Sequence, residues 1–219
     1  MRKPWHEANP AFYDEVMQQV EAAYPDLHFV VHNNVVFLSG SFPLKDGERI
    51  VDRYSIEVAF PPNYPCDLPL VWEIGGRIPR TADRHIYTNG ATCLFVLDER
   101  AWICPEGTSL LDFLNGPVRN FFLGQSLFEI DGVWPFGQRS HGVQGILEFY
   151  AERLDTNDKS VIIRYLDVLR KKDLKGHWRC PCGSGKRLRK CHMKLVVELH
   201  EKIPHTVALQ SWQRMSDMR

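Results

Sequence analysis

Four potential metal ligands lie within thirteen residues near the C-terminus of this chain. Cys180 and Cys182 are separated by one residue, and Cys191 and His192 follow as an adjacent pair. Three thiolates and one imidazole form a complete tetrahedral ligand set for zinc, with no open position for catalysis. The segment is too short and too polar to build an apolar core, so metal binding must supply its folding free energy. The sequence therefore predicts a structural zinc site.

This segment resembles the SEC-C motif, a zinc-binding appendage found at protein ends. The basic residues Lys186, Arg187, Arg189 and Lys190 accompany the ligands. Such a run is more typical of a solvated face than of a nucleic-acid site, and Trp178 supplies only one aromatic ring for stacking. Nucleic-acid association through this basic tail remains an alternative function.

The composition predicts a globular protein with free thiols. The 219 residues, 44% of them hydrophobic, allow one medium domain and a small appendage. No segment resembles a signal peptide or a membrane span, so we expect a cytoplasmic protein without a membrane partner. Cys66, Cys93 and Cys104 remain outside the zinc cluster. This odd number favours free thiols in a reducing compartment.

The net charge of zero conceals two regions of opposite sign. Residues 165–195 contain ten Lys or Arg and two Asp, whereas residues 1–164 contain fourteen basic and twenty-two acidic residues. The basic segment could therefore contact the acidic domain of its own chain or an external polyanion.

The first seventy-five residues predict one helix followed by four strands. Asn9-Pro10 is a helix start, and the apolar spacing continues to Pro25. Strands are expected at 27–31, 35–42, 50–60 and 68–74, the first two joined by a turn at Asn33-Asn34. Along 50–60, apolar residues alternate with mostly polar ones, so one face of this strand is expected to be buried. This order predicts an α+β domain with an antiparallel four-stranded meander.

The remainder of the chain predicts mainly helices after an irregular stretch at 75–108. The expected helices are 109–123, kinked or split at Gly116-Pro117, then 143–153, 160–171 and a short one at 195–202. Residues 206–219 are weakly patterned and are expected to fray. The expected organisation is a main α+β domain at 1–158, a helical linker at 159–176, and the zinc module with its tail at 177–219.

Two motifs in this order resemble the ubiquitin-conjugating enzyme (UBC) fold over residues 9–155. They are Phe60-Pro61-Pro62-Asn63-Tyr64-Pro65 before the fourth strand and Asn89-Gly90-Ala91-Thr92-Cys93-Leu94 in the loop after it. The divergent sequence and the appended zinc module are similar to bacterial ubiquitin-conjugating relatives encoded in antiphage operons, including those of the CBASS type.

The resemblance implies a transferase in which Cys93 carries a thioester. The partners implied are a ubiquitin-activating-like enzyme, a ubiquitin-like modifier or the C-terminus of a nucleotidyltransferase (CD-NTase), and a target protein whose amine accepts the modifier. A thiol suits this role because its thiolate is both a good nucleophile and a good leaving group.

The family's His-Pro-Asn triplet falls here on Asp83-Arg84-His85, so His85 replaces the asparagine. Its imidazole could donate to the oxyanion, a contact that contributes roughly 3 kcal/mol in other enzymes, or act as a base, since the unperturbed pKa of histidine in general is about 6.5. The candidate catalytic residues are Cys93, His85 and Asn89. Asp98 or Asp112 could orient or deprotonate an incoming lysine.

The other cysteines and Tyr87 have simpler interpretations. Cys66 and Cys104 are expected to be structural, and the apolar neighbours of Cys104 suggest burial. Tyr87 is expected to pack in the core. The missing triplet leaves a second functional alternative open, a catalytically inactive UBC-fold binding or adaptor module.

Overall fold

The computed structural model describes residues 3–135, 139–140 and 142–217, and the chain forms two compact units. The N-terminal unit comprises Met1–Leu94 and Glu106–Gln138, and the C-terminal unit comprises Phe95–Pro105 and Arg139–Arg219. The helix expected at 143–153 belongs to the C-terminal unit, whereas the sequence predicted it as part of the domain at 1–158. Among the described residues, none of the helices has both the length and the apolar character needed to cross a membrane.

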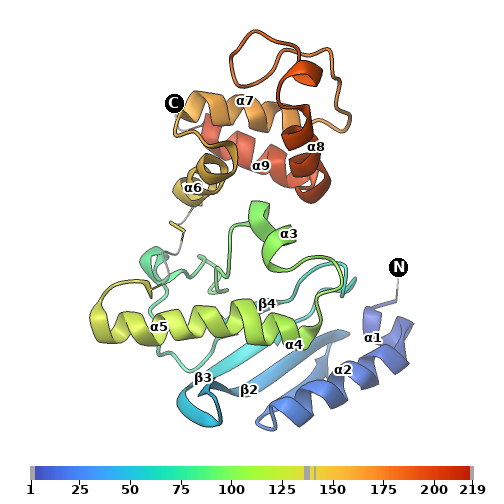
Figure 1. Ribbon diagram of the computed structural model, residues 1–219. Coiled ribbons are helices and arrows are strands. Elements are labelled where there is room, and N and C mark those ends of the chain that lie inside the picture. The colour runs from blue at the N-terminus through green and yellow to red at the C-terminus, as the bar shows by residue number, and fades with distance from the viewer. Residues whose placement is uncertain (1–2, 136–138, 141, 218–219) are drawn as a thin grey trace. The chain divides into compact units, whose positions relative to one another are not determined.

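The N-terminal unit contains the predicted antiparallel sheet, in the order β1-β2-β3-β4. The strands are β1 (Leu27–His32), β2 (Val35–Asp46), β3 (Arg49–Ala59) and β4 (Leu70–Glu73) (Figure 1). Asn33 and Asn34 have φ angles of 48° and 61°, the paired positive values that a tight two-residue hairpin requires. Tyr54, Ile56 and Val58 are buried at alternate positions of β3, so the predicted one-sided strand is confirmed.

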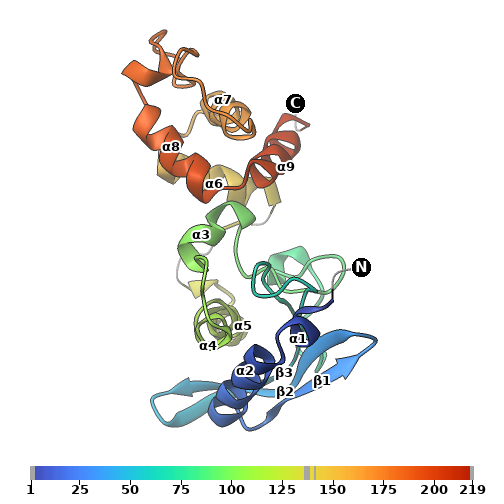
Figure 2. The ribbon, with the colours of Figure 1, turned by 90° about the vertical axis from the view of Figure 1, so that its right-hand side faces the viewer.

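Helix α2 (Pro10–Ala23) follows the short α1 (Trp5–Ala8) and lies along one face of the sheet (Figure 2). The predicted start is confirmed, because the Asn9 side chain accepts a hydrogen bond from the Phe12 N–H at 3.3 Å and Pro10 occupies the first turn. At the other end, the Tyr24 ring stacks on Phe42 of β2 with 5.2 Å between centroids. This contact fixes the helix on the apolar face.

The helix predicted at 109–123 is longer than expected and changes its winding at the predicted place. It comprises α4 (Leu110–Phe113), a π-helical segment η3 (Leu114–Val118) and α5 (Arg119–Asp131). Pro117 lacks the N–H that a regular helix would use, and the wider turn accommodates it without ending the helix. Phe122 of α5 packs on Phe42 and Tyr54 at 5.9 and 4.7 Å, on the same face of the sheet as α2.

The proline-rich segment before β4 is packed by an aromatic cluster. The Trp5 ring lies 5.5 Å from Phe60 and 4.8 Å from Tyr64, and its main-chain N–H donates to the Pro62 carbonyl at 3.0 Å. This segment therefore shapes the approach to β4.

The C-terminal unit is helical. Its elements are η2 (Leu97–Glu99), α3 (Arg100–Ile103), α6 (Gly142–Leu154), α7 (Lys159–Leu169), η5 (Leu188–Lys190), α8 (Met193–Lys202) and α9 (His205–Ser216). Phe149, Leu166, Leu188, Val196 and Met215 are fully buried in one core that joins these helices to the cysteine-rich loop. The loop is therefore part of this unit.

The expectation that residues 206–219 fray is wrong over α9. Ala208, Ser211 and Met215 of this helix are 0%, 3% and 0% exposed. The local pattern is weak because one buried position is a serine, whose hydroxyl donates to Asp98, 113 residues away, at 2.7 Å. Such a long-range polar contact leaves no periodic signal in the sequence.

Candidate metal centre and cysteine loop

The four predicted metal ligands converge in the C-terminal unit. The Sγ atoms of Cys180, Cys182 and Cys191 and a ring nitrogen of His192 all lie within 4.8 Å of one another. His192 Nδ1 is 3.3 Å from both Cys180 Sγ and Cys191 Sγ, and the Cys182 and Cys191 sulfurs are 3.6 Å apart. Ordinary zinc–sulfur and zinc–nitrogen bond lengths give tetrahedral edges of roughly 3.6–3.8 Å. The donor set fits a tetrahedral ion.

The backbone of the loop places the two ligand pairs opposite each other. The Cys180 N–H donates to the Lys186 carbonyl at 2.8 Å, so the chain folds back between the pairs. Gly183 and Gly185 make this possible with φ angles of 84° and 73°. From α7, Arg164 Nε donates to the Pro181 carbonyl at 2.8 Å and ties the loop to the helix.

Polar groups surround the sulfurs. The Ser184 hydroxyl oxygen lies 3.2 Å from Cys182 Sγ and 3.5 Å from Cys191 Sγ, where it can donate to a thiolate. Burial raises the pKa of Tyr165, and the neighbouring cysteines raise it further by a smaller amount. Its phenol therefore stays protonated beside the cluster. These contacts suit thiolate ligands.

Comparison with known proteins identifies this segment alone. Residues 179–194 match the SEC-C motif, a Cys-rich zinc-binding motif, and the four-residue cluster within them could bind a metal ion. No curated protein matches the chain. No solved structure matches it either.

Cys93 lies in the N-terminal unit at the end of a small hairpin attached to β4. Thr92 joins this hairpin to the sheet, because its N–H and its hydroxyl both donate to the Val71 carbonyl, at 2.8 and 3.1 Å. The next residue, Cys93, donates its N–H to the His85 carbonyl at 2.8 Å. The structure thus brings together the two ends of the predicted site, His85 and Cys93, through the main chain.

The three cysteines outside the metal cluster differ in exposure. Cys93 is half-buried, Cys66 is exposed and Cys104 is buried. Burial raises the pKa of Cys104 to about 11, which keeps it protonated and unreactive. The expected burial of Cys104 is confirmed.

Asn89 and Tyr87 occupy the tip of this hairpin. The Asn89 side-chain oxygen accepts a hydrogen bond from the Ala91 N–H at 3.0 Å, and the main-chain carbonyl of Asn89 accepts one from Trp72 Nε1 at 3.3 Å. Asn89 therefore holds the tip against β4. The expectation that Tyr87 packs in the core is wrong, because at this exposed tip it is 44% exposed.

His85 adopts a left-handed backbone conformation, with φ 53° and ψ 42°, and is 8% exposed. Its ring meets the Trp134 ring edge to face, with 4.6 Å between centroids. His85 is thus fixed by its backbone on one side and by an aromatic ring on the other.

A clamp on α5 holds the segment before Cys93, and no pattern in the sequence predicted it. Arg84 Nε donates to the Gln125 side-chain oxygen at 2.8 Å, and Gln125 Nε2 donates back to the Arg84 carbonyl at 2.7 Å. Trp134 Nε1 adds a hydrogen bond to the Asp83 carbonyl at 3.0 Å. The partners are 41 to 51 residues apart, so no local pattern reveals them.

The two carboxylates considered for an incoming lysine lie in different units. Asp98 belongs to the C-terminal unit and is 2% exposed; it accepts hydrogen bonds from Tyr150 at 2.6 Å and Ser211 at 2.7 Å. Burial raises its pKa. This enclosure removes Asp98 as a base for an external amine. Asp112 is exposed on α4, where it accepts from the Ser109 hydroxyl at 2.7 Å.

Proposed function

We propose that the chain is a ubiquitin-conjugating-like transferase that carries a ubiquitin-like modifier, or a protein C-terminus, as a thioester on Cys93. The observation that carries this proposal is the position of Cys93. It is a half-buried thiol at the end of a braced hairpin that extends the edge of a four-stranded antiparallel sheet.

The order of elements along the chain supports the proposal. Helix α2 precedes the meander β1–β4, the hairpin with Cys93 follows, and α4 and α5 come after the short elements η2 and α3, which belong to the C-terminal unit. This is the order that the resemblance to the UBC fold implies for residues 9–155. A bacterial antiphage conjugation pathway is the setting that fits this resemblance together with the appended zinc module.

The chemistry proposed at Cys93 has two balanced steps. In the first, the Cys93 thiolate attacks the thioester carbonyl held by an activating enzyme, a new carbon–sulfur bond forms, and the donor thiolate leaves. In the second, a target amine attacks the new thioester, an amide forms, and the Cys93 thiol is released after the amine gives up its proton. Neither step needs an oxidant or a metal.

The residues around Cys93 would act mainly by positioning. The His85 carbonyl accepts from the Cys93 N–H and so sets the orientation of the main chain there. Asn89 and Thr92 hold the hairpin on β4, and the Arg84–Gln125 clamp holds its start on α5. Effective thioester exchange depends on such fixed geometry.

The metal cluster has a separate, structural role in this proposal. Cys180, Cys182, Cys191 and His192 would hold one zinc ion, whose binding folds the loop onto α7. A complete set of four protein ligands leaves no position for water or substrate.

Reconstitution tests the transferase. With an activating enzyme, its modifier and ATP, the purified chain should form an adduct that is sensitive to reductant, and the adduct should be absent from Cys93→Ala. A Cys66→Ala variant is the matched control and should form the adduct normally. Adduct formation by Cys93→Ala would show that the site is assigned wrongly.

One observation favours a second function, a binding or adaptor module without catalysis. His85 stands where the resemblance places the family's asparagine, and its ring packs on Trp134. Alkylation separates the two functions. If the Cys93 thiol reacts with iodoacetamide no faster than that of Cys66, a binding role is favoured over catalysis.

A further inference from the structure

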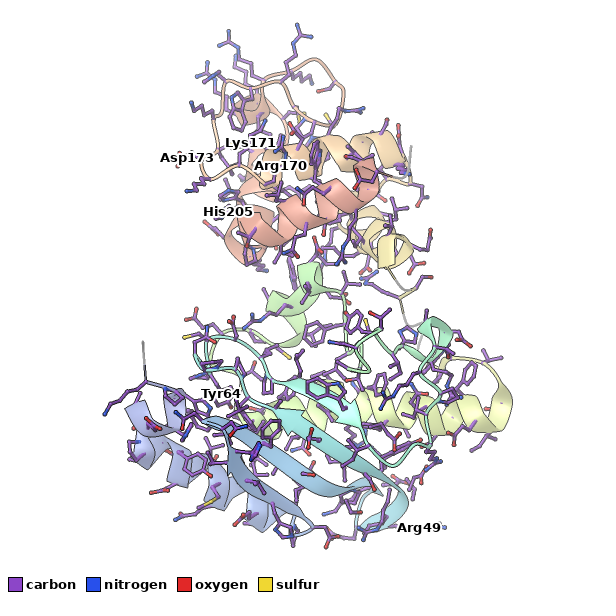
Figure 3. The ribbon with its side chains drawn as sticks, turned by 180° about the vertical axis from the view of Figure 1, so that it is seen from behind. Arg49, Tyr64, Arg170, Lys171, Asp173 and His205 are labelled. Carbon is purple, nitrogen blue, oxygen red and sulfur yellow. The ribbon has the colours of Figure 1, made fainter. Side chains whose placement is uncertain are left out.

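The loop that carries the metal cluster presents an exposed basic face. Eight basic side chains between residues 172 and 194 are exposed, and Asp173 is the one acidic residue in that range. They are Lys172, Lys175, Arg179, Lys186, Arg187, Arg189, Lys190 and Lys194. We call these eight residues the basic face. Figure 3 shows nitrogen-tipped side chains around this loop and labels Asp173 at its edge.

The basic face is not neutralised within the part of the chain that the structure describes. Its eight cations form no ion pair there, whereas the adjacent Arg170 and Lys171 both bind Asp167, the latter at 3.0 Å. A cluster of unpaired like charges is costly unless an external anion offsets it. The unpaired charges therefore leave this face available to an anionic partner.

The backbone fixes several of these cations before any partner arrives. Arg179 and Arg187 face each other across an antiparallel bridge, and the Arg189 N–H donates to the Gly176 carbonyl at 3.0 Å. The metal cluster closes the same loop. Because the frame is formed in advance, little conformational entropy of the main chain is lost when an anion binds.

A pocket adjoins the basic face between α7, α9 and the loop. It encloses about 360 Å³ and is lined by Ile163, Arg164, Asp167, Val168, Arg179, Cys180, Pro181 and Trp212. Its walls are largely apolar, and the Asp167 carboxylate in them is paired with Lys171. The Arg170 guanidinium carbon lies 4.1 Å from the centroid of the Trp212 ring and covers one side of it. Arg179 belongs to both the pocket and the basic face.

We propose that the basic face binds single-stranded nucleic acid, with one unpaired base seated in the pocket beside Trp212. The phosphates would contact the exposed lysines and arginines, which accounts for their single sign. A flat ring beside Trp212, with its phosphate near Arg179, would use both the apolar walls and the cationic rim. An acidic protein would match the charge, but it offers no flat ring to stack beside Trp212 in the pocket.

Fluorescence anisotropy with the full, metal-loaded chain tests this proposal. The probes are a labelled 20-nucleotide DNA strand, the RNA strand of the same sequence, the DNA duplex and polyglutamate. We expect either single strand to bind more tightly than duplex or polyglutamate, and the tighter of the two identifies the natural type of strand. Equal or tighter binding of duplex or polyglutamate would overturn the proposal.

Two double variants distinguish binding at the basic face from a general effect of net charge. Lys186→Ala/Arg187→Ala should weaken binding about tenfold and reduce the slope of log K against log salt by about 1.4, the value for two lost phosphate contacts. The double variant Lys3→Ala/Arg49→Ala removes the same charge from exposed positions in the N-terminal unit and should change neither quantity. Equal effects of the two double variants would reduce the interaction to net charge and contradict the proposal.

The pocket is tested by Trp212→Leu. Loss of one stacked base should weaken single-strand binding about fivefold or more while the salt slope stays unchanged. Metal content and the thermal unfolding curve show whether this variant is folded, and Arg179→Ala provides a second pocket variant that leaves the core intact. Unchanged affinity in folded Trp212→Leu and in Arg179→Ala would show that no base binds in the pocket.

Discussion

The main-chain N–H of Cys93 donates a 2.8 Å hydrogen bond to the carbonyl oxygen of His85. His85 is held in a left-handed backbone conformation by the turn that ends at Arg84. The main chain at Cys93, the proposed nucleophile, is therefore oriented by His85. This residue has a left-handed backbone and carries an imidazole where the resemblance implies an asparagine.

The left-handed conformation predicts an order among substitutions at His85. Asparagine tolerates this conformation, whereas valine is strained in it by about 1–2 kcal/mol. We expect His85→Asn to keep the Cys93 amide protected from hydrogen exchange and His85→Val to expose it. Hydrogen exchange of peptides covering 82–94 measures both. Equal protection in the two variants would contradict a backbone role for His85.

The clamp on α5 predicts that Gln125 matters for the same loop. Gln125 is 0% exposed and exchanges two hydrogen bonds with Arg84. Gln125→Leu removes the partner of the Arg84 Nε–H and of the Arg84 carbonyl in the interior. It should lower the free energy of unfolding by about 2–3 kcal/mol. Chemical denaturation measures this change. Gln18→Leu, at an exposed position of α2, is the control and should have an effect below about 0.5 kcal/mol.

Asp52 predicts an acid dependence of stability. Two hydrogen bonds from Arg77, at 2.7 and 2.8 Å, hold the pKa of Asp52 at about 2, below its ordinary 3.8, against the opposing effect of partial burial; Ser126 also donates to it. Because the folded pKa is the lower one, the stabilisation is present above about pH 4 and is lost as the pH falls towards 2.

Solvent screening of the partly exposed Arg77 limits this contribution to about 1–2 kcal/mol. Asp52→Asn should therefore be less stable than wild type at pH 7, and the difference should shrink between pH 4 and pH 2. Urea denaturation at several pH values measures it. A difference between the two proteins that stays constant from pH 7 to pH 2 would argue against the assignment.

Removal of the metal predicts a loss of structure confined to one unit. A chelator, or Cys191→Ala, should release the ion and lower the stability of the C-terminal unit by more than about 3 kcal/mol, because metal binding folds the loop. Metal analysis and hydrogen exchange of peptides covering 177–193 check this. Cys66→Ala should retain one equivalent of metal. An intact loop without metal would contradict the structural role.

The features that the sequence predicted are those set by neighbouring residues. The cap at Asn9, the hairpin turn at Asn33-Asn34, the alternation along β3 and the converging metal ligands each depend on spacings of a few residues. At that range side-chain chemistry and backbone preference decide the structure directly. This is why the meander and the ligand cluster could be predicted.

The features that escaped prediction depend on distant partners. Nothing in the sequence near Gln125 indicates that its side chain donates to the Arg84 carbonyl. Likewise, Ser211 is buried because Asp98 accepts its hydrogen bond. The exposed position of Tyr87 follows from the hairpin that pairs with β4. These contacts are products of tertiary packing, and a single sequence carries no local record of them.

A synthetic glycyl thioester peptide tests whether Cys93 carries a thioester. Intact-mass and peptide-mapping mass spectrometry would follow transfer of the peptide to each cysteine of the metal-loaded chain. We predict a thiol-reversible adduct that forms on Cys93 faster than on the exposed Cys66, disappears in Cys93→Ala, and is converted to an amide by added lysine. Transfer to Cys66 at an equal or greater rate, or no adduct on Cys93, would rule out this role for Cys93.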